Sequence, residues 1–258
     1  MFDQLAETLF SPHYCRPVLL RMLSEETWPP DSHKAGDSLY FLHPKERETF
    51  SGYKLAKRRA EYLTGRACAK LAIQHYCALS QQGINRLEIG QIAIFPGTDG
   101  RPVITQQPTP QIPALEISIS HSRKYAVAAV SRQHCGIDIQ YLSETLLRVQ
   151  EKYCAPEEDR LLRLELPGHK QLARLATLWA AKEAVQKNGS HRKMPGFQDI
   201  ELKELKEIPT HSSRFHLVFQ VKGHSAHHNY PVAATLFDDY ALALSIKGNS
   251  QNARTARG

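Results

Sequence analysis

The sequence predicts an α+β fold in which two similar halves meet near residue 132. Each half combines strand-like runs with one long helical pattern, at 52–79 in the first half and at 171–188 in the second. With 258 residues, of which 41% are hydrophobic and 23% charged, the chain has the composition of a globular protein that buries a core. No strict sequence repeat accompanies the two halves, so the duplication is inferred from element order alone.

The first half is expected to be irregular, then helical, then stranded. Five prolines interrupt residues 1–50. The helix at 52–79 carries a basic cluster in its early part, and a short strand at 92–95 ends in a glycine- and proline-rich turn. A polar, proline-rich loop is expected next. Strand-like runs follow, and a tight connection predicts that they form a three-stranded meander: 115–120, 125–131 and 134–140.

The second half is predicted to be helical first and stranded afterwards. Its second helix has a proline at the first position and three acidic residues in the first turn, which is typical of a helix start. Asn188-Gly189 ends the third helix. The expected helices are 142–153, 156–166 and 171–188, and the expected strands are 215–221, 232–237 and 241–246. We therefore divide the chain into a half at 1–132, a half at 133–248 and a disordered tail at 249–258.

Two short segments carry the candidate site. One is a predicted strand that places Asp138 and Gln140 on one face, because side chains two residues apart share a face. The other is a predicted helix that places Glu183 and Lys187 on one stripe. Two carboxylates beside a lysine favour Mg²⁺ and an anionic substrate, because Mg²⁺ keeps phosphates and waters among its ligands. Taken singly, Asp138 also fits a strand-end aspartate, and Glu183 a helix-surface partner of Lys187.

Composition limits the compartment and the partners. No apolar run approaches the roughly 20 residues of a membrane span, and the N-terminus lacks a signal-peptide pattern, so a cytoplasmic protein without a membrane partner is expected. The five cysteines form no C-x-x-C pair and predict reduced, buried thiols. His224, His227 and His228 lack an evident fourth zinc ligand. The net charge of +7 indicates an anionic partner: nucleic acid, an acidic protein or a phosphorylated cofactor.

Five segments in register resemble the motifs of the 4′-phosphopantetheinyl transferases, over roughly residues 54–247. The two signature segments are Gly136-Ile137-Asp138-Ile139-Gln140 and Trp179-x-x-Lys182-Glu183-Ala184-x-x-Lys187. Ile119-Ser120-His121-Ser122 and the Gly100-Arg101-Pro102 turn extend the match. Residues 58–69 are similar to the enterobactin-synthase component D-like branch of the surfactin-type (Sfp) group. Each motif alone is weak evidence, but five in the family's order are strong evidence.

The resemblance implies a fold, a reaction and a set of site residues. The fold would be two pseudo-symmetric α/β halves that form a pseudo-dimer within one chain, for which a monomer is natural. The reaction would be Mg²⁺-dependent transfer of the phosphopantetheine arm of coenzyme A to a serine of an acidic acyl or peptidyl carrier protein, releasing 3′,5′-ADP. Asp138 and Glu183 would hold the metal, with Gln140 nearby, and Glu183 or Glu157 would be the base. The predicted phosphate contacts are Arg58, Arg66, Arg101, Ser120, His121, Lys182 and Lys187.

One departure and two alternatives accompany this interpretation. Many surfactin-type members have glutamate where this chain has Gln140, so we expect weaker metal binding in the absence of substrate. The first alternative is a basic nucleic-acid-binding module, prompted by the net charge and by the basic segment Lys54–Lys70. The second is a family member that has lost catalysis and only binds coenzyme A or a carrier protein. The family also leaves the pathway open, although the branch favours siderophore or peptide-synthetase carriers.

Overall fold

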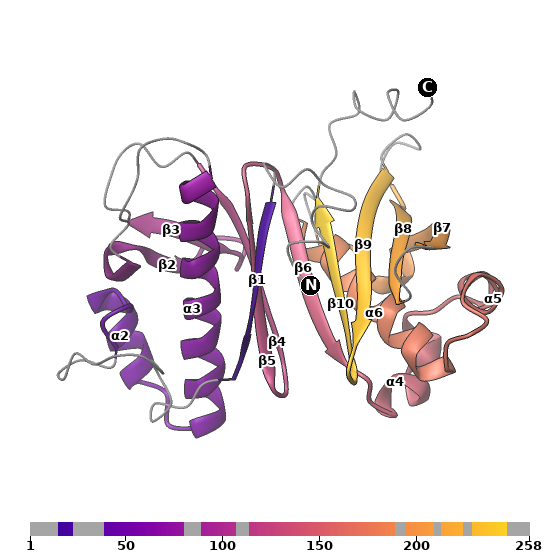
Figure 1. The fold of residues 1–258 in the computed structure, drawn as a ribbon, viewed down its shortest axis with the longest axis horizontal. Coiled ribbons are helices and arrows are strands. Elements are labelled where there is room, and N and C mark those ends of the chain that lie inside the picture. The colour runs from indigo at the N-terminus through magenta and orange to yellow at the C-terminus, as the bar shows by residue number, and fades with distance from the viewer. Residues whose placement is uncertain are drawn as a thin grey trace. The chain divides into compact units, whose positions relative to one another are not determined.

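The computed structural model describes residues 15–22, 39–79, 89–106, 114–188, 194–208, 213–223 and 229–246. It has an α+β architecture, as predicted, and divides into two compact units, Met1–Arg132 and Gln133–Gly258 (Figure 1). The histidines at 224, 227 and 228 and the predicted tail at 249–258 lie outside the described residues.

The first unit is a three-stranded antiparallel sheet with one long helix packed against it. The strand order is β1-β5-β4, and α3 runs along the sheet (Figure 1). A second, two-stranded sheet pairs β2 with β3. The elements are β1 (Cys15–Arg21), α2 (Pro44–Ser51), α3 (Ala56–Leu79), η1 (Ile89–Gln91), β2 (Ala93–Pro96), β3 (Pro102–Gln106), β4 (Glu116–Ser122) and β5 (Tyr125–Ser131).

The second unit is a five-stranded antiparallel sheet in the order β6-β10-β9-β8-β7, with α6 packed on β6, β10 and β9. Its elements are β6 (Cys135–Tyr141), α4 (Thr145–Arg148), η2 (Gln150–Lys152), α5 (Pro156–Glu165), α6 (Gln171–Lys187), η3 (Phe197–Asp199), β7 (Ile200–Glu207), β8 (Arg214–Val221), β9 (Asn229–Phe237) and β10 (Tyr240–Ile246).

The two units repeat one order of elements. Each begins with a strand, continues with a proline-started helix and a long helix, and ends with two strand pairs. The last strand of each unit lies between the first strand and the last but one, so β5 corresponds to β10, β1 to β6 and β4 to β9. This shared order is the internal similarity that the sequence indicated without a visible repeat.

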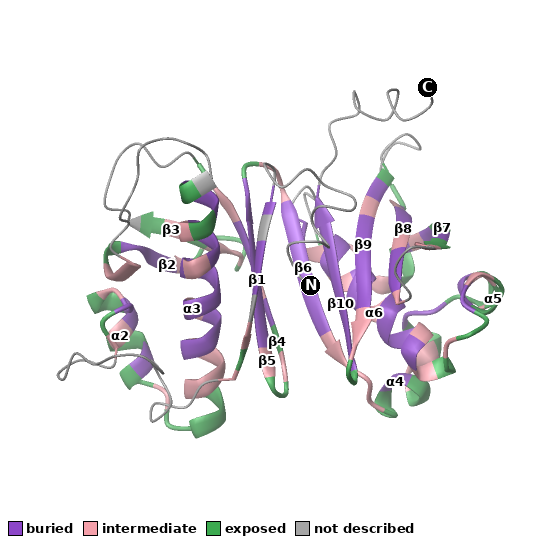
Figure 2. Ribbon diagram, viewed as in Figure 1, coloured by how far each residue is buried: buried purple, intermediate pink, exposed green. Residues whose placement is uncertain are grey.

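Small side chains let α6 approach its sheet closely. Four of its five buried alanines belong to the hydrophobic core, and the strand beneath it, β10, is buried along its whole length (Figure 2). Because alanine has no side chain beyond Cβ, the helix axis can lie near the sheet, and the core is closed by larger residues from α5 and the strands. The alanines are Ala176, Ala180, Ala181 and Ala184.

Several predicted elements were wrong. The region 1–50, expected to be irregular, contains β1 and α2. The meander is confirmed for its first two strands, since β4 pairs with β5, but wrong for its third: β6 pairs with β10, because β1 and β4 already occupy the two edges of β5. The strand β7 was missed, and the helix expected at 142–153 is the shorter α4 followed by η2.

Two compositional expectations can be checked. All five cysteines are buried thiols outside any disulfide, as predicted. Within the described part of the chain, no helix has the length and apolar character needed to cross a membrane.

Candidate active site

The site begins with an aspartate in the middle of β6. Asp138 is 3% exposed, and its side chain lies on the face of β6 that α6 covers. A buried carboxylate needs a partner, since an unpaired charge in a protein interior is strongly unfavourable. Lys187, in the last turn of α6, supplies it: its Nζ donates a hydrogen bond of 2.6 Å to Asp138 Oδ1.

The second carboxylate comes from one turn earlier in α6. Glu183 Oε2 lies 3.4 Å from Lys187 Nζ, so the strand acid and the helix acid share one ammonium group. The side chains of Glu183 and Lys187 are 28% and 27% exposed, which leaves this end of the site open to solvent and to a ligand. The structure thus brings together Asp138, Glu183 and Lys187, as the sequence predicted.

The surroundings of Glu183 and Lys187 shift the pKa values of both groups. Burial and the nearby Asp138 carboxylate raise the pKa of Glu183, and Lys187 only partly offsets this. Burial disfavours the ammonium of Lys187, but the carboxylates of Asp138 and Glu183 outweigh that effect and raise the pKa of Lys187. The site therefore holds a fixed positive charge beside a carboxylate that binds a proton more readily than an ordinary glutamate.

A glycine makes this geometry feasible. Gly136 precedes Asp138 on the same face of β6, and a Cβ built on it would lie 2.0 Å from the carbonyl oxygen of Ala184 and 2.6 Å from the amide nitrogen of Asn188. The end of α6 is also held by Asn188, whose Nδ2 donates to Ser245 Oγ of β10 at 3.0 Å. This close approach brings Lys187 within reach of Asp138.

The donor set fits Mg²⁺ when a substrate supplies further oxygens. In the described part of the chain, no group of three or more His, Cys, Asp or Glu side chains is arranged to hold a metal ion. One or two carboxylates suffice for Mg²⁺ when phosphates complete its shell. Gln140 is half-buried on the same face, and its Nε2 donates to the Tyr141 carbonyl at 2.8 Å. Its amide oxygen is the atom that could bind a metal, because an amide nitrogen has no free lone pair.

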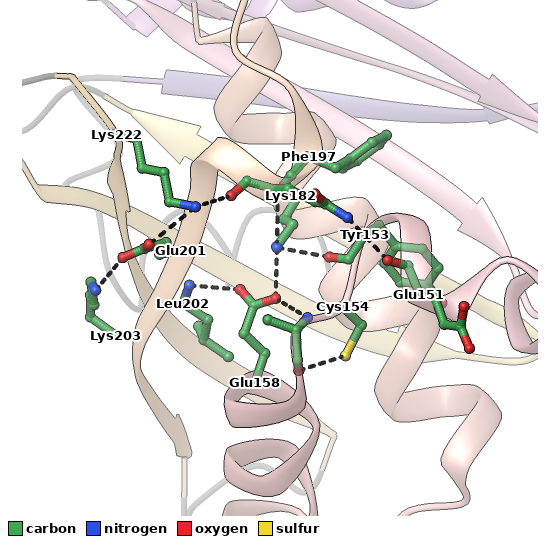
Figure 3. Close-up of polar contacts among 12 residues, drawn as sticks. Glu151, Tyr153, Cys154, Glu158, Lys182, Phe197, Glu201, Leu202, Lys203 and Lys222 are labelled. Carbon is green, nitrogen blue, oxygen red and sulfur yellow. Dashed lines mark hydrogen bonds and ion pairs between the residues drawn. The ribbon is translucent and has the colours of Figure 1, made fainter.

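The ammonium group of Lys182 is surrounded by acceptors of its own unit. Its side chain is 1% exposed, and its Nζ donates to Glu158 Oε2 at 2.7 Å and to the carbonyl oxygens of Tyr153 and Phe197 at 2.8 and 3.0 Å (Figure 3). An ammonium group has three protons to donate, and these contacts use all three. The position of Lys182 therefore does not support the predicted contact with a diphosphate.

Of two neighbouring glutamates, the sequence analysis selected the one that is exposed. Glu157 is exposed on α5, whereas Glu158 is buried and accepts hydrogen bonds from the backbone nitrogens of Ala155 and Leu202 as well as from Lys182. The sequence contained a signal for Glu158. With Pro156 at the first helical position, Glu158 occupies the third, where a glutamate accepts a hydrogen bond from the backbone N–H at the start of the helix.

In the first unit, two predicted phosphate contacts converge on a carboxylate that the sequence analysis missed. Arg58 Nη1 lies 3.5 Å from Glu61 Oε2, and His121 Nδ1 lies 3.7 Å from Glu61 Oε1. Lys57 Nζ lies 3.8 Å from the same carboxylate. The spacing of Glu61 from Lys57 and Arg58 on a helix would have indicated this cluster.

The other predicted contacts of the first unit are spread over three elements. Arg66, on α3, has its Nε 3.3 Å from Glu46 Oε1 and its guanidinium 4.7 Å above the ring of Tyr62. Arg101 lies in the turn between β2 and β3, where its Nε donates to Asp99 at 2.6 Å. Ser120 is buried on β4.

Comparison with known proteins places the second unit in a family. The family model for the 4′-phosphopantetheinyl transferase superfamily matches residues 134–245. A holo-[acyl-carrier-protein] synthase of Streptococcus mutans is 36% identical over 86 residues, which cover 33% of this chain and 67% of that protein. The chain belongs to the 4′-phosphopantetheinyl transferase superfamily.

This transferase-superfamily chain is also similar to a second relative and to two solved structures. The 4′-phosphopantetheinyl transferase psf-1 of Bacillus pumilus is 33% identical over 101 residues, 39% of this chain, and the match spans only 41% of that relative's length. The complex of ACPS with CoA from Chronobacterium ammoniagenes has 20% identity and a TM-score of 0.36, covering 45% of this chain and 93% of that one. A holo-(acyl-carrier-protein) synthase from Bacillus anthracis in complex with CoA (3′,5′-ADP) has 25% identity and a TM-score of 0.33, covering 45% and 92%.

The superfamily match covers some site residues and not others. The acids and lysines of the second unit, Asp138, Glu157, Lys182, Glu183 and Lys187, lie within the matched residues, as does Gln140. The predicted phosphate contacts of the first unit lie before residue 134, so their part in a superfamily reaction rests on the motifs alone.

Proposed function

We propose that the protein transfers the 4′-phosphopantetheine arm of coenzyme A to a serine of an acyl or peptidyl carrier protein and releases 3′,5′-ADP. The observation that carries the proposal is the convergence of Asp138 and Glu183 on one lysine, at the end of a helix that the superfamily model includes. A diphosphate leaving group requires that negative charge on oxygen be neutralised, and this site combines a fixed ammonium with two metal-binding carboxylates.

Each residue of the proposed site has a distinct task. Asp138 and Glu183 would hold Mg²⁺, with Gln140 directly or through a water, and the ion would supply charge neutralisation at the diphosphate when bound. Lys187 keeps the two carboxylates oriented and adds a positive charge beside the bound phosphates. Because its pKa is raised by those carboxylates, Lys187 stays protonated throughout the physiological range.

A carboxylate must accept the proton of the attacking serine hydroxyl. Glu183 suits this role, directly or through a water, because burial and Asp138 raise its pKa toward the operating pH, where a general base is most effective. Glu157, exposed at the start of α5, is the second candidate.

The first unit supports the proposal through a local excess of positive charge. The single carboxylate of Glu46 lies beside two cations, Arg66 and Lys70, whereas the corresponding carboxylate in the second unit, Glu158, has one, Lys182. The additional guanidinium of Arg66 suits an anionic ligand, such as a phosphate of coenzyme A. Arg58, His121 and Arg101 are proposed as further phosphate contacts, whereas Lys182 and its three protein acceptors favour a structural role.

The carrier class is part of the proposal. We infer a surfactin-type enzyme of the enterobactin-synthase component D-like branch, acting alone as a monomer on siderophore or peptide-synthetase carriers, because of the motif at residues 58–69. Comparing kcat/KM for a peptidyl carrier and a fatty-acid acyl carrier tests this choice, and a preference for the acyl carrier would reject it.

Mass spectrometry of an apo-carrier protein tests the function directly. Incubated with coenzyme A, Mg²⁺ and this protein, the carrier should gain one phosphopantetheine, and the gain should vanish with Asp138→Ala and with Glu183→Ala. Glu201→Ala is the control, because this carboxylate of β7 pairs with Lys203 and with Lys222, which follows β8, and its removal should leave transfer intact. Coenzyme A binding without transfer by the wild type would favour the alternative of a binding protein that has lost catalysis.

A further inference from the structure

A buried glutamate–lysine pair fixes the long helix of the first unit. Lys70 of α3 is fully buried; its Nζ pairs with Glu46 Oε2 of α2 at 2.5 Å and donates to the Phe41 carbonyl at 2.6 Å. The same carboxylate accepts from two backbone nitrogens, that of His43 at the start of α2 and that of Ile94 in β2. One charge pair therefore ties together a helix start, the long helix and a strand.

The second unit contains the same arrangement. Lys182 of α6 pairs with Glu158 Oε2 of α5 and donates to the Tyr153 carbonyl (Figure 3). Glu158 accepts from the backbone nitrogen of Ala155 at the start of α5 and from that of Leu202 in β7. In both units the glutamate and the lysine are 24 residues apart. We call these the first-unit pair (Glu46 and Lys70) and the second-unit pair (Glu158 and Lys182).

The surroundings of the two lysines differ in one functional respect. In α6, Glu183 is one residue after Lys182, and Lys187 is five residues after Lys182. In α3 the same places hold Leu71 and His75, and the strand position that corresponds to Asp138 holds Val18. The two units therefore share the pair, but only the second adds an acid site one residue away from it.

We propose that Glu158 and Lys182 are positioning residues for the transfer site: their pair sets the place of α6, and so the contact of Lys187 with Asp138. This rests on the proposed function for its effect on catalysis, but not for its effect on structure. The helix is held on two sides, by the second-unit pair toward α5 and β7 and by the close contact of Gly136 toward β6. Removing one support lets the helix shift against the other, because packed interiors move as units.

A cleft beside the second-unit pair allows α6 to shift locally when Lys182 is replaced. A cavity of about 1180 Å³ is lined by Glu158, Lys182 and residues of α4, α5 and β7. When Lys182 is truncated, water from this cleft can reach the remaining carboxylate. The variant then adjusts by displacing α6 rather than by unfolding the unit.

The test compares Lys182→Met with Lys70→Met, which removes the same kind of buried cation from the first unit. In crystal structures, the distance between Lys187 Nζ and Asp138 Oδ1 should exceed about 3.5 Å in Lys182→Met and stay within hydrogen-bonding range in Lys70→Met. Both variants should melt at a lower temperature than the wild type. In transfer assays, Lys182→Met should lower kcat at least about tenfold, whatever the accompanying change in the KM for coenzyme A.

Three outcomes would overturn the proposal. An intact Lys187–Asp138 bond in Lys182→Met would show that the pair stabilises the unit without positioning the site. The same lengthening in Lys70→Met would indicate general loosening. A raised KM for coenzyme A at unchanged kcat would assign Lys182 to substrate contact instead.

Two further points keep the test decisive. If Lys182→Met does not fold, Glu158→Gln, which retains the side-chain volume and one acceptor, is put through the same measurements. If the wild type transfers no phosphopantetheine, the proposed function fails, while the distance comparison still decides whether the pair positions Lys187.

Discussion

The surroundings of Glu183 disfavour the ionised form of its side chain. Burial and Asp138 favour its protonated form, and Lys187 compensates only in part. Asp138 and Glu183 repel each other and thereby lower the stability of the metal-free protein. Such an arrangement is typical of functional sites, where a metal or substrate supplies the missing positive charge.

Replacing Glu183 by glutamine should stabilise the metal-free protein at neutral pH. Because the pKa of Glu183 is raised on folding, the folded state binds this proton more tightly than the unfolded state does. Stability from this group is therefore full below about pH 4.5 and is lost as the pH rises through the raised pKa. We expect the free energy of unfolding of Glu183→Gln to exceed that of the wild type at about pH 7.5, with the difference vanishing near pH 4.

Urea unfolding in the presence of a chelator, repeated over this pH range, measures the effect. Glu151→Gln, at an exposed position in η2, is the control and should stay within about 0.5 kcal/mol of the wild type throughout. If Glu183→Gln were less stable than the wild type at neutral pH, the pairing with Lys187 would outweigh burial and Asp138. Such a result would contradict the assigned direction of the pKa shift.

At the scale of elements, the sequence predicted the parts that have strong periodicity. The helix α6 and the strand β6 were expected almost at their observed bounds, because alternating and helical patterns of apolar residues are visible locally. The helix α2 is only eight residues long and begins with a proline, and β7 reads Ile-Glu-Leu-Lys-Glu-Leu-Lys-Glu, a pattern with as much helical as strand character. The hairpin of β4 and β5 was expected, but pairing between strands that are distant in the chain was beyond the sequence, since it depends on which of them occupies each edge.

The site shows the same division between local and tertiary information. Spacing alone placed Asp138 and Gln140 on one face and Glu183 and Lys187 on one stripe. It could not distinguish Lys182 from Lys187, because both lie on α6 and only tertiary packing buries one of them against Glu158. Burial of a charge is decided by the elements that surround it, and these come from distant parts of the chain.

The contact between α6 and β6 should tolerate no side chain at Gly136. In Gly136→Ala the new methyl group would overlap the carbonyl oxygen of Ala184, so α6 must move away from the strand. We expect a loss of about 1–3 kcal/mol or more in the free energy of unfolding. Transfer activity should fall as well, because Lys187 and Glu183 move with the helix.

Gly168→Ala is the matched control for chemical denaturation and transfer assays. No heavy atom lies within 4 Å of the Cβ position at Gly168, so this variant should stay within about 0.5 kcal/mol of the wild type. Equal stabilities of the two alanine variants would mean that α6 does not approach β6 as closely as the structure indicates.

At the scale of the whole molecule, the two units contribute different charged groups to the proposed function. Both contain the glutamate–lysine pair, but the second carries the acids and the first carries the additional arginine beside Glu46. Across the full chain, positive charge exceeds negative charge by 7. An excess of this size attracts acidic partners over long distances and is weakened by salt.

Docking of an acidic carrier protein should therefore depend on ionic strength more than the chemical step does. Between about 0.05 M and about 0.5 M NaCl, the Debye length falls severalfold, so attraction between exposed charges is screened. The contact between Lys187 and Asp138 is screened less by salt than a fully exposed pair would be, because the side chain of Asp138 is only 5% exposed. We expect the KM for the carrier to rise several-fold over this range and kcat to change less than about twofold.

A carrier variant with fewer acidic residues on its surface is the control, and its KM should respond less to salt. If the KM of the unmodified carrier did not change with salt, docking would depend on apolar contacts rather than on the net charge. A labelled oligonucleotide measured in the same series separates the nucleic-acid alternative. Because phosphate contacts release counterions, tight oligonucleotide binding at low salt that displaces the carrier would favour nucleic acid as the anionic partner of this protein.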